Sequence, residues 1–455
     1  MDKTFFQTKK IHFVGIGGHG VSALARLASV SGIKVTGSDL EESPIIEELR
    51  KLGIAVQLGH QAKNLEADVE KVIYTSAASP KDNPELVEAQ KRNIPIYTYA
   101  QALGLISQER PTIAISGTNG KTTTTILLGL MLAAGGLDPL VIAGGNVAGE
   151  HGGGFRMGQG PFVVEACEAY RNFLNIHPAH LIITNIEEDH LDYYKDLAEI
   201  VGAFEKLISQ TKPGGTLLLN VDDEECQKIQ DTEHKKQTFG IEYSADYRAT
   251  NIKSSVDSQS FLIHNSLFII HIPGRFNIYN ALAAAAMAMS LDVKPEAIQK
   301  VLDDFKGSWR RFEKLGEYRG ATIISDYGHH PAGVKGTIEA ARQKYPDQRI
   351  ILAFHPHHKW RTRMLFDQFI DAFLDADIVV LNEIWSAPGR EPREDRISSK
   401  DLVKVLKKKG LTESYYGADL DETKKILDGL IKPGDVILMM GAGYIYKLAE
   451  RLVKS

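Results

Sequence analysis

The sequence is poor in cysteine, with only Cys167 and Cys226 among its 455 residues. Two cysteines cannot build the disulfide framework of a small secreted domain, so the sequence indicates a protein of a reducing compartment. The chain also has no apolar run of membrane-spanning length, and its polar start, Met1–Gln7, does not have the pattern of a signal peptide. We therefore expect a soluble, cytoplasmic protein that does not bind membranes.

Long basic segments are absent as well. The formal net charge is -5 at pH 7, which argues against a general nucleic-acid or membrane-surface binder. At 455 residues the chain is long enough for two to four domains, each with its own core.

The most informative stretch predicts a phosphate-binding loop. Thr112–Ile115 has the pattern of a buried strand, Gly117–Gly120 that of a tight loop, and Lys121 begins a predicted helix. In this order the backbone N–H groups point at phosphate oxygens, Lys121 adds a cation, and the Thr122 hydroxyl can ligate Mg²⁺. The full eight-residue P-loop pattern would need a glycine at Ile115. The shorter form in this context still favours phosphate binding over a glycine-rich turn beside a surface lysine.

The first hundred residues begin like a Rossmann unit. A strand and glycine turn in Lys10–Gly20 precede a helix, and a second strand, Lys34–Asp39, ends on an acidic residue. In a dinucleotide dehydrogenase such an aspartate holds the ribose, so an NAD-dependent oxidoreductase is one interpretation. The same geometry accommodates a nucleotide sugar, and the glycine spacing does not choose between them. By residue type alone, His60 is an ordinary histidine at a strand end.

Polar residues follow two further predicted strands in the middle of the chain. Glu165 comes after one apolar strand, and Asp189 and His190 follow the next. Ligands of parallel sheets bind at the carboxyl ends of the strands, so Thr122, Glu165 and His190 are expected to converge and hold one or two Mg²⁺ ions.

Two asparagines precede a predicted helix, Ala281–Met289. Asn277 and Asn280 either cap this helix or contact a purine base through their amides.

Strands and helices alternate again from Ala321 to Gly441, which predicts a third α/β unit. Five histidines fall within thirty residues there, and Arg361 and Arg363 follow them. Because neither an HExxH spacing nor a cysteine partner is present, a histidine metal site is disfavoured. Arginine can bind a carboxylate through two hydrogen bonds, so the anionic end of a substrate is the better interpretation.

Taken together, these motifs resemble those of the Mur ligases, ATP-dependent enzymes that extend the peptide of the bacterial cell-wall precursor. The resemblance covers nearly the full chain. Its anchors are Gly15–Ser22, Gly117–Thr125, Glu165–Glu168, Thr184–His190, Pro273–Asn277, Arg310–Glu313, Asp326–Pro331 and Gly441–Gly443. The first glycine motif, Asp326–Pro331 and Arg361–Arg363 are most similar to the branch that joins L-alanine to UDP-N-acetylmuramate.

The resemblance implies an α/β protein of three domains. These are a Rossmann-like, UDP-sugar-binding domain (1–107), a central P-loop-type ATPase domain with a parallel sheet (108–311), and a Rossmann-like C-terminal ligase domain (312–455). It implies ATP and Mg²⁺ as cofactors, UDP-N-acetylmuramate and L-alanine as substrates, and an acyl-phosphate intermediate. The protein is expected to be a monomer or a homodimer.

The resemblance also assigns site residues. The UDP-sugar site would contain Gly17, Gly18, Ser38, Asp39, His60 and Ser76, which replaces the NAD interpretation and gives His60 a role. The ATP site would contain Gly117, Thr118, Asn119, Gly120, Lys121, Thr122, Thr123, Asn277, Asn280 and Arg311. Mg²⁺ would be bound by Thr122, Glu165 and His190. The amino acid would be bound by Tyr327, His329 and Arg361, and Lys121, His329 and Arg361 would be the catalytic residues.

The chain departs from the alanine-adding branch at Asn119 and Phe276, where histidine is common, and at His358, where arginine is common. Lys206 lies near the place where other branches carry a carbamylated lysine, and we leave it out of the site. Three alternatives stay open: a sister ligase that attaches a tripeptide, an NAD-dependent oxidoreductase, and a nucleotide-binding regulator without catalysis.

Overall fold

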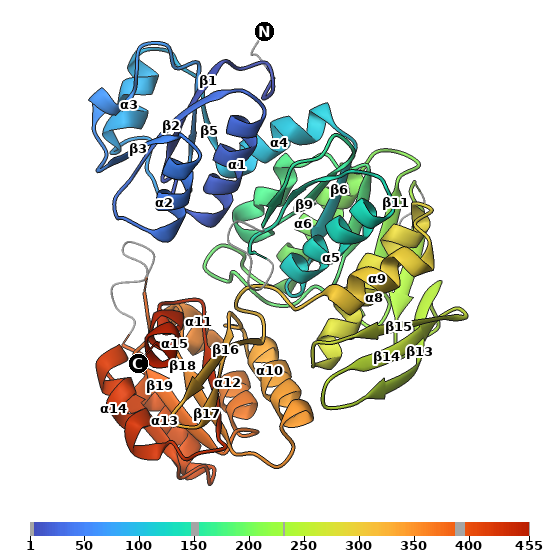
Figure 1. Ribbon diagram of the computed structural model, residues 1–455, viewed down its shortest axis with the longest axis vertical. Coiled ribbons are helices and arrows are strands. Elements are labelled where there is room, and N and C mark those ends of the chain that lie inside the picture. Colours follow the sequence, from blue (N-terminus) through green and yellow to red (C-terminus); the bar gives the residue numbers. More distant parts are fainter. Residues whose placement is uncertain (1–3, 147–153, 231–232, 387–395, 455) are drawn as a thin grey trace. The chain divides into compact units, whose positions relative to one another are not determined.

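The structure is a computed structural model that describes residues 4–146, 154–230, 233–386 and 396–454 (Figure 1). Its internal contacts group the chain into two compact units. The first unit comprises Met1–Ile186, Val201–Tyr247 and Ala283–Val301, and the second comprises Glu187–Ile200, Arg248–Leu282 and Leu302–Ser455.

The first unit contains a five-stranded sheet of order β3-β2-β1-β4-β5 in which all pairs are parallel. Its strands are β1 (Lys10–Val14), β2 (Lys34–Asp39), β3 (Ala55–Leu58), β4 (Lys71–Tyr74) and β5 (Ile96–Thr98). Its helices are α1 (His19–Val30), α2 (Pro44–Lys51), the short η1 (Ala62–Asn64), α3 (Pro84–Lys91) and α4 (Tyr99–Glu109). Strands β2 and β3 lie on one side of β1, and β4 and β5 lie on the other. A ligand crevice is therefore expected at the carboxyl end of β1, where the strand order switches sides.

Seven strands of the ten-stranded second sheet lie in the same unit, in the order β12-β11-β10-β6-β9-β7-β8, and they are parallel except for the last pair. These strands are β6 (Thr112–Ser116), β7 (Leu140–Ile142), β8 (Phe155–Arg156), β9 (Phe162–Glu165), β10 (His180–Ile183), β11 (Thr216–Asn220) and β12 (Lys235–Gly240). The accompanying helices are α5 (Lys121–Ala134), η2 (Ala169–Asn175), α6 (Leu197–Ser209) and α7 (Glu224–Lys228). All residues of β6 and β11 are buried, as expected for central parallel strands with both faces covered.

An antiparallel meander of β13 (Tyr247–Ser254), β14 (Gln259–Ile263) and β15 (Ser266–Ile270) precedes two helices, α8 (Arg275–Ser290) and α9 (Pro295–Asp304). The expected start of α8 at Ala281 is wrong, because the helix begins at Arg275. Gly274, with φ +94°, makes the turn that allows this early start. Asn277 and Asn280 therefore lie within the first turns of α8, so helix capping does not account for them.

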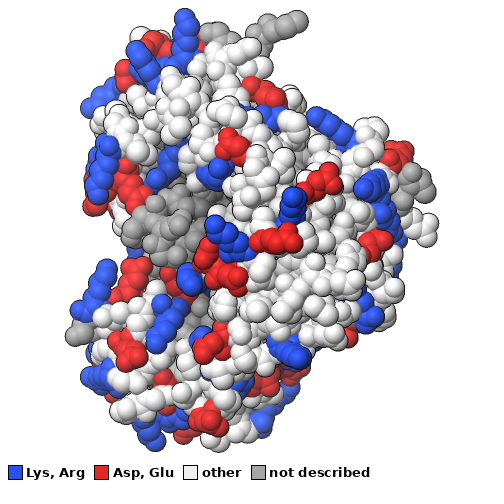
Figure 2. Space-filling view, turned by 45° about the vertical axis from the view of Figure 1, so that its right-hand side comes forward, with Lys and Arg blue, Asp and Glu red and all other residues white. Residues whose placement is uncertain are grey.

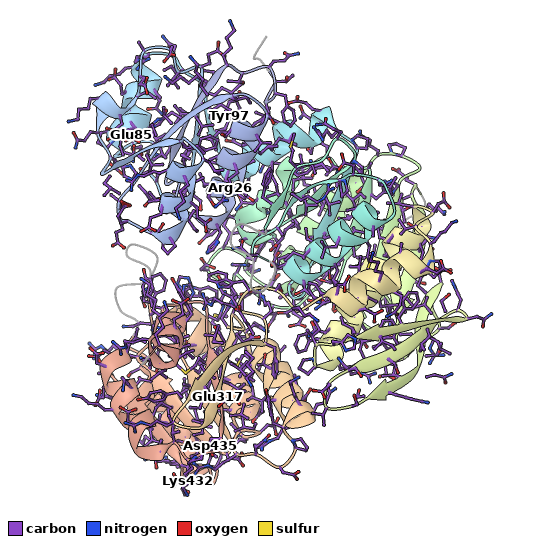
Figure 3. All side chains as sticks on the ribbon, in the orientation of Figure 1. Arg26, Glu85, Tyr97, Glu317, Lys432 and Asp435 are labelled. Carbon is purple, nitrogen blue, oxygen red and sulfur yellow. The ribbon has the colours of Figure 1, made fainter. Side chains whose placement is uncertain are left out.

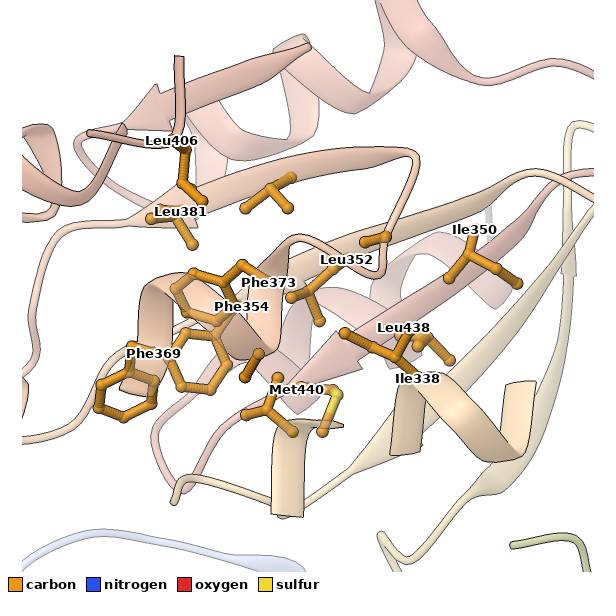
Figure 4. Close-up of a cluster of buried hydrophobic side chains, with 14 of the residues drawn as sticks. Ile338, Ile350, Leu352, Phe354, Phe369, Phe373, Leu381, Leu406, Leu438 and Met440 are labelled. Carbon is orange, nitrogen blue, oxygen red and sulfur yellow. The ribbon is translucent and has the colours of Figure 1, made fainter. Parts of the chain in front are cut away.

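The third sheet has the order β16-β17-β21-β18-β19-β20, and only its first pair is antiparallel. The strands are β16 (Glu313–Tyr318), β17 (Ala321–Asp326), β18 (Ile350–Phe354), β19 (Ile378–Asn382), β20 (Ser414–Gly417) and β21 (Val436–Met440). The helices are α10 (Pro331–Lys344), α11 (Lys359–Met364), α12 (Phe366–Phe373), α13 (Ser399–Lys408), α14 (Leu420–Leu430) and α15 (Ile445–Val453). On one face of this sheet, Phe354, Phe369 and Phe373 pack with ring centroids 5.3 to 5.7 Å apart in a buried apolar cluster (Figure 4).

These sheets confirm the predicted α/β class, and each falls within one of the three predicted domain segments. Cys167 and Cys226 are free thiols. Basic and acidic side chains intermingle on the face drawn in Figure 2. Within the described part of the chain, no helix combines the length and the apolar character needed to cross a membrane.

Candidate active site

The predicted phosphate loop lies between β6 and α5 of the first unit. Gly117 has φ +135°, and a Cβ there would approach the Thr184 hydroxyl to 2.1 Å, so only glycine fits. Gly120 has φ +84° and is the residue before the helix. Asn185 holds the loop from β10, since its carbonyl accepts the Thr118 N–H (3.0 Å) and its Oδ1 accepts the Asn119 N–H (2.8 Å).

Lys121 is the first residue of α5. Its ammonium donates to the carbonyls of Gly117 (2.5 Å) and Thr118 (3.0 Å) and pairs with the Glu168 carboxylate at 2.9 Å. Burial alone would lower the pKa of Lys121, but the charges of Glu168, Cys167 and Glu165 raise it above its usual range. Lys121 is therefore a cation at neutral pH, held at the mouth of the loop.

Thr122 and Glu165 meet as the sequence predicted. The Thr122 hydroxyl donates to Glu165 Oε2 at 2.8 Å, and the Gly144 N–H donates to the same oxygen at 2.7 Å. A hydroxyl and a carboxylate side by side next to a helix N-terminus are the hard oxygen ligands that Mg²⁺ prefers. The residues present in the first unit thus fit this ion.

His190, the third predicted metal ligand, belongs to the second unit. It has φ +53°, and its Nε2 lies 3.8 Å from the carboxylate of its neighbour Asp189. Asp189 in turn accepts two hydrogen bonds from Arg361, from Nε at 3.2 Å and from a terminal nitrogen at 2.7 Å. Both side chains of this pair are almost fully buried.

The Arg361–Asp189 pair shifts the pKa values of its own carboxylate and of groups beside it. Burial by itself would raise the pKa of Asp189, but Arg361 and the neighbouring histidines hold it well below its usual range. The motifs predict that Arg361 binds the carboxylate of an amino acid, whereas in the structure its guanidinium is bonded to Asp189. Asp189 is the partner that the sequence alone did not reveal.

The turn after β17 carries Tyr327 between two guanidinium groups. Arg310 and Arg311 each lie 4.9 Å from the Tyr327 ring centroid. The backbone is fixed by Asp326, which accepts the N–H groups of Phe312 (2.8 Å) and Gly328 (2.6 Å). Cationic groups stacked on an aromatic ring form a rigid, electropositive platform.

His329 and His355 are both neutral at physiological pH. Burial and the nearby charge of Arg361 lower the pKa of His329 well below its usual range, and its Nδ1 lies 3.1 Å from the Tyr327 carbonyl. Burial lowers the pKa of His355 to about 4. A neutral imidazole keeps a lone pair that can accept a hydrogen bond from an amine, which fits His329 as a predicted amino-acid-binding residue.

In the first sheet, the glycine turn after β1 is tied to the end of β2. The Gly17 N–H donates to Asp39 Oδ2 at 2.8 Å, and a Cβ at Gly17 would come within 3.0 Å of that oxygen. His60 follows β3, and its Nδ1 lies 3.0 Å from Ser38 Oγ. Gly18 lies beside this turn as the residue before α1, and Ser76 lies in the turn after β4. The carboxyl ends of β1, β2 and β3 thus carry most of the predicted UDP-sugar residues.

The same domain has a cavity of about 250 Å³. It is lined by His12, Thr36, Gly37, Ala55, Gln57, Lys63, Asn64 and Glu66. None of the predicted UDP-sugar residues lines it.

Besides Asp189, the residues Glu168, Asn185 and Glu85 contact predicted site residues, although the sequence did not assign them to a site. Glu168 and Asn185 lie within the motifs Glu165–Glu168 and Thr184–His190, so their closeness in sequence to the predicted site residues was the available signal. Glu85, which is fully buried and accepts a hydrogen bond from Ser38 at 2.6 Å, had no such signal.

A phosphate loop at the carboxyl edge of a parallel sheet, in a chain with two further α/β sheets, defines a multidomain nucleotide-binding protein. Three family profiles match the chain: the Mur ligase family catalytic domain over residues 10–110, the Mur ligase middle domain over 115–288, and the Mur ligase glutamate ligase domain over 310–443.

Curated relatives include the UDP-N-acetylmuramate–L-alanine ligase of Geotalea uraniireducens, 39% identical over 454 residues that cover 98% of each chain. The corresponding ligase of Desulfitobacterium hafniense is 39% identical over 97% of this chain and 99% of its own. Among solved structures, UDP-N-acetylmuramate-alanine ligase from Thermotoga maritima matches with a TM-score of 0.82 and 30% identity over 98% of each chain. The chain belongs to the Mur ligase family, as its motifs predicted.

A murein peptide ligase from Psychrobacter arcticus shares the fold, with a TM-score of 0.73 and 22% identity over 98% of each chain. Family membership replaces the interpretation of the first domain as part of an NAD-dependent oxidoreductase.

Proposed function

We propose that this protein joins L-alanine to the lactyl carboxylate of UDP-N-acetylmuramate, with conversion of ATP to ADP and phosphate. The observation that carries the proposal is the full-length identity of 39% to ligases named for this reaction, in a chain that has the phosphate loop with Lys121. The domains would be those predicted, 1–107 for the UDP-sugar, 108–311 for ATP and 312–455 for the amino acid.

The reaction begins with activation of the carboxylate. A carboxylate oxygen attacks the γ-phosphorus of ATP, the bond to the β-phosphate oxygen breaks, and an acyl phosphate and ADP form. Phosphoryl transfer depends mainly on positioning and on charge stabilisation. The Lys121 ammonium and the N–H groups at the start of α5 would stabilise the negative charge on the transferred group, and Asn277, Asn280 and Arg311 would help to bind the nucleotide.

The amine of L-alanine then attacks the acyl carbon. The tetrahedral intermediate expels phosphate, and an amide remains. His329, kept neutral by its surroundings, would hold the amine or accept the proton that the amine loses. Tyr327 would line the amino-acid site. Arg361 would bind the amino acid with its guanidinium, which Asp189 holds in place.

A phosphate-release assay with UDP-N-acetylmuramate and L-alanine tests the proposal. We expect phosphate release that depends on both substrates. UDP-N-acetylglucosamine is the matched control, since it lacks the lactyl carboxylate and should release none. Glycine, L-serine and the tripeptide are offered in parallel, and faster release with the tripeptide than with L-alanine would identify the sister activity instead.

We propose that Thr122, Glu165 and His190 bind Mg²⁺. Thr122 and Glu165 are in hydrogen-bond contact. Asn185 contacts the loop, and His190 follows it by five residues, so the two residues are at most about 18 Å apart along the chain. When bound, Mg²⁺ would neutralise charge on the phosphates of ATP.

Replacement of Thr122 by alanine should raise the Mg²⁺ concentration for half-maximal activity about tenfold, because one ligand is lost. Thr122→Ser keeps the hydroxyl and should stay close to the wild type. An unchanged Mg²⁺ titration in Thr122→Ala would remove Thr122 from the metal site.

A further inference from the structure

The carboxylate of Glu85 is completely buried, although the proposed reaction does not use it. Glu85 lies in the first turn of α3, where Figure 3 labels it. Asn83 caps this helix and fixes the Glu85 backbone, because its side-chain oxygen accepts the N–H groups of Glu85 (3.0 Å) and Leu86 (3.2 Å). A buried charge is costly unless its lone pairs are satisfied, so the partners of Glu85 show what it does.

Each oxygen of Glu85 accepts from two donors. Oε2 accepts from Ser38 Oγ at 2.6 Å and lies 3.4 Å from His12 Nε2. Oε1 accepts from Asn64 Nδ2 at 2.6 Å and from the Gln61 N–H at 3.2 Å. Burial would raise the pKa of Glu85, but its hydrogen bonds from His12, Ser38 and Asn64 lower it below its usual value. The side chain of Glu85 is thus an anion with four hydrogen-bond donors around its carboxylate.

The link from Glu85 to the predicted nucleotide site runs through Ser38. The single hydroxyl proton of Ser38 is donated to Glu85, so its oxygen can only accept a further hydrogen bond. His60 Nδ1 lies 3.0 Å from that oxygen and 3.6 Å from Glu85 Oε2. Two acceptors face Nδ1, so the network requires a proton there.

For a neutral ring, a proton on Nδ1 also defines the other ring nitrogen of His60. A neutral imidazole with its proton on Nδ1 carries a lone pair on Nε2, which can only accept a hydrogen bond. The side chain of His60 is 16% exposed, whereas that of Glu85 is fully buried. The partly exposed His60 can thus contact a ligand, while the buried Glu85 carboxylate determines which ring nitrogen carries the proton.

We propose that Glu85 is a positioning residue for the UDP-sugar: through Ser38 it fixes the tautomer of His60, so that Nε2 accepts a hydrogen bond from a uridine hydroxyl or imide N–H. The inference rests on the proposed function, because it takes Ser38 and His60 as part of that site. It assigns His60 to the nucleoside part of the substrate.

Glu85→Gln is the first test. An amide has one acceptor oxygen, so it cannot satisfy donors on both sides, and Ser38 would turn to accept from the amide and donate to His60. We expect about tenfold weaker binding of UDP by calorimetry and a tenfold higher KM for the UDP-sugar, the effect of one lost hydrogen bond. The kcat and the KM for ATP should stay within about twofold. Glu88→Gln, on the same helix and only partly buried, is the matched control.

A double-mutant cycle separates positioning from a general loss of structure. If Glu85 acts through His60, Glu85→Gln in a His60→Ala background should weaken UDP binding by less than twofold. A full tenfold loss in that background would overturn the inference.

Nitrogen NMR of the histidine ring measures the tautomer directly. We expect the proton on Nδ1 of His60 in the wild type and on Nε2 in Glu85→Gln. A wild-type His60 protonated on Nε2 alone would overturn the inference, and this measurement holds even if Glu85→Gln does not fold. If the wild type fails to bind UDP, the proposed function fails. If it binds UDP and Glu85→Gln binds equally well, only the inference fails.

Discussion

The phosphate loop and a second polar cluster, made of Asp189, His329 and Arg361, both use segments that follow the carboxyl ends of parallel strands. They are built differently. The loop uses backbone groups and side chains from one short stretch, Gly117 to Thr122, with Asn185 and Glu168 as supports. The cluster joins side chains from segments up to 172 residues apart, as in Arg361 and Asp189.

This difference indicates which of the two regions contributes to binding and which contributes to stability. A loop whose donors are its own backbone can lose a side chain and keep its shape. A cluster of buried charges depends on each partner, because a charge left without its counterion in a low dielectric is costly. We therefore expect mutations in the loop to act on activity and mutations in the cluster to act on stability.

The largest expected effect is on the loop. Lys121→Ala should reduce ligation about 10³-fold, because a cation that stabilises the transferred phosphoryl group is lost. UDP binding by calorimetry should stay unchanged. Lys212→Ala, an exposed lysine of the same unit, is the control and should keep wild-type activity. Substantial ligation by Lys121→Ala would contradict the assignment of the loop to ATP.

Asp189→Asn should lower the stability of the second unit by about 3 to 5 kcal/mol, since it leaves the buried Arg361 charge without its counterion. Tryptophan fluorescence during urea denaturation measures this, because Trp309, Trp360 and Trp385 all lie in that unit.

Asp371→Asn is the matched control for Asp189→Asn. Asp371 pairs with Lys409 at 3.1 Å in the same unit, but both side chains are exposed, so a loss of about 0 to 1 kcal/mol is expected. Equal shifts for the two variants would show that burial does not strengthen the Arg361 pair.

The third expected effect is a loss of folding stability at acidic pH, caused by His355. The pKa of His355 is lowered to about 4 in the folded protein, against about 6.5 in the unfolded chain. The unfolded state therefore binds the proton first, so folding stability is fully present above pH 6.5 and falls as the pH drops toward 4. The loss from this residue should reach about 3 kcal/mol.

Urea denaturation at pH 7, 5.5 and 4 measures this loss, and His355→Gln should show a shallower pH dependence. His271→Gln replaces a histidine of the same unit whose side chain is 41% exposed, and it should keep the wild-type dependence. A His355→Gln profile parallel to that of the wild type would show that His355 is not the source.

Much of the fold could be predicted from the sequence. Continuous apolar runs such as Ile113–Ile115 and Ile350–Phe354 marked buried parallel strands, and a glycine, Gly117, marked the turn after the first of them. The start of α8 was misplaced, because the pattern of alanines from Ala281 hid the earlier turn at Gly274. Helix ends depend on the local backbone conformation, which apolar periodicity does not report.

The sequence by itself determined the family, the strand, loop and helix around Gly117–Gly120, and the closeness of Thr122 to Glu165. These follow from contiguous motifs and from the rule that parallel strands end at one edge. Only the tertiary structure decided that Arg361 binds Asp189 and that Glu85 holds Ser38 beside His60. Such contacts join residues far apart in the chain. Folding brings them together because a buried charge must find its partners, and no local pattern records which partner it finds.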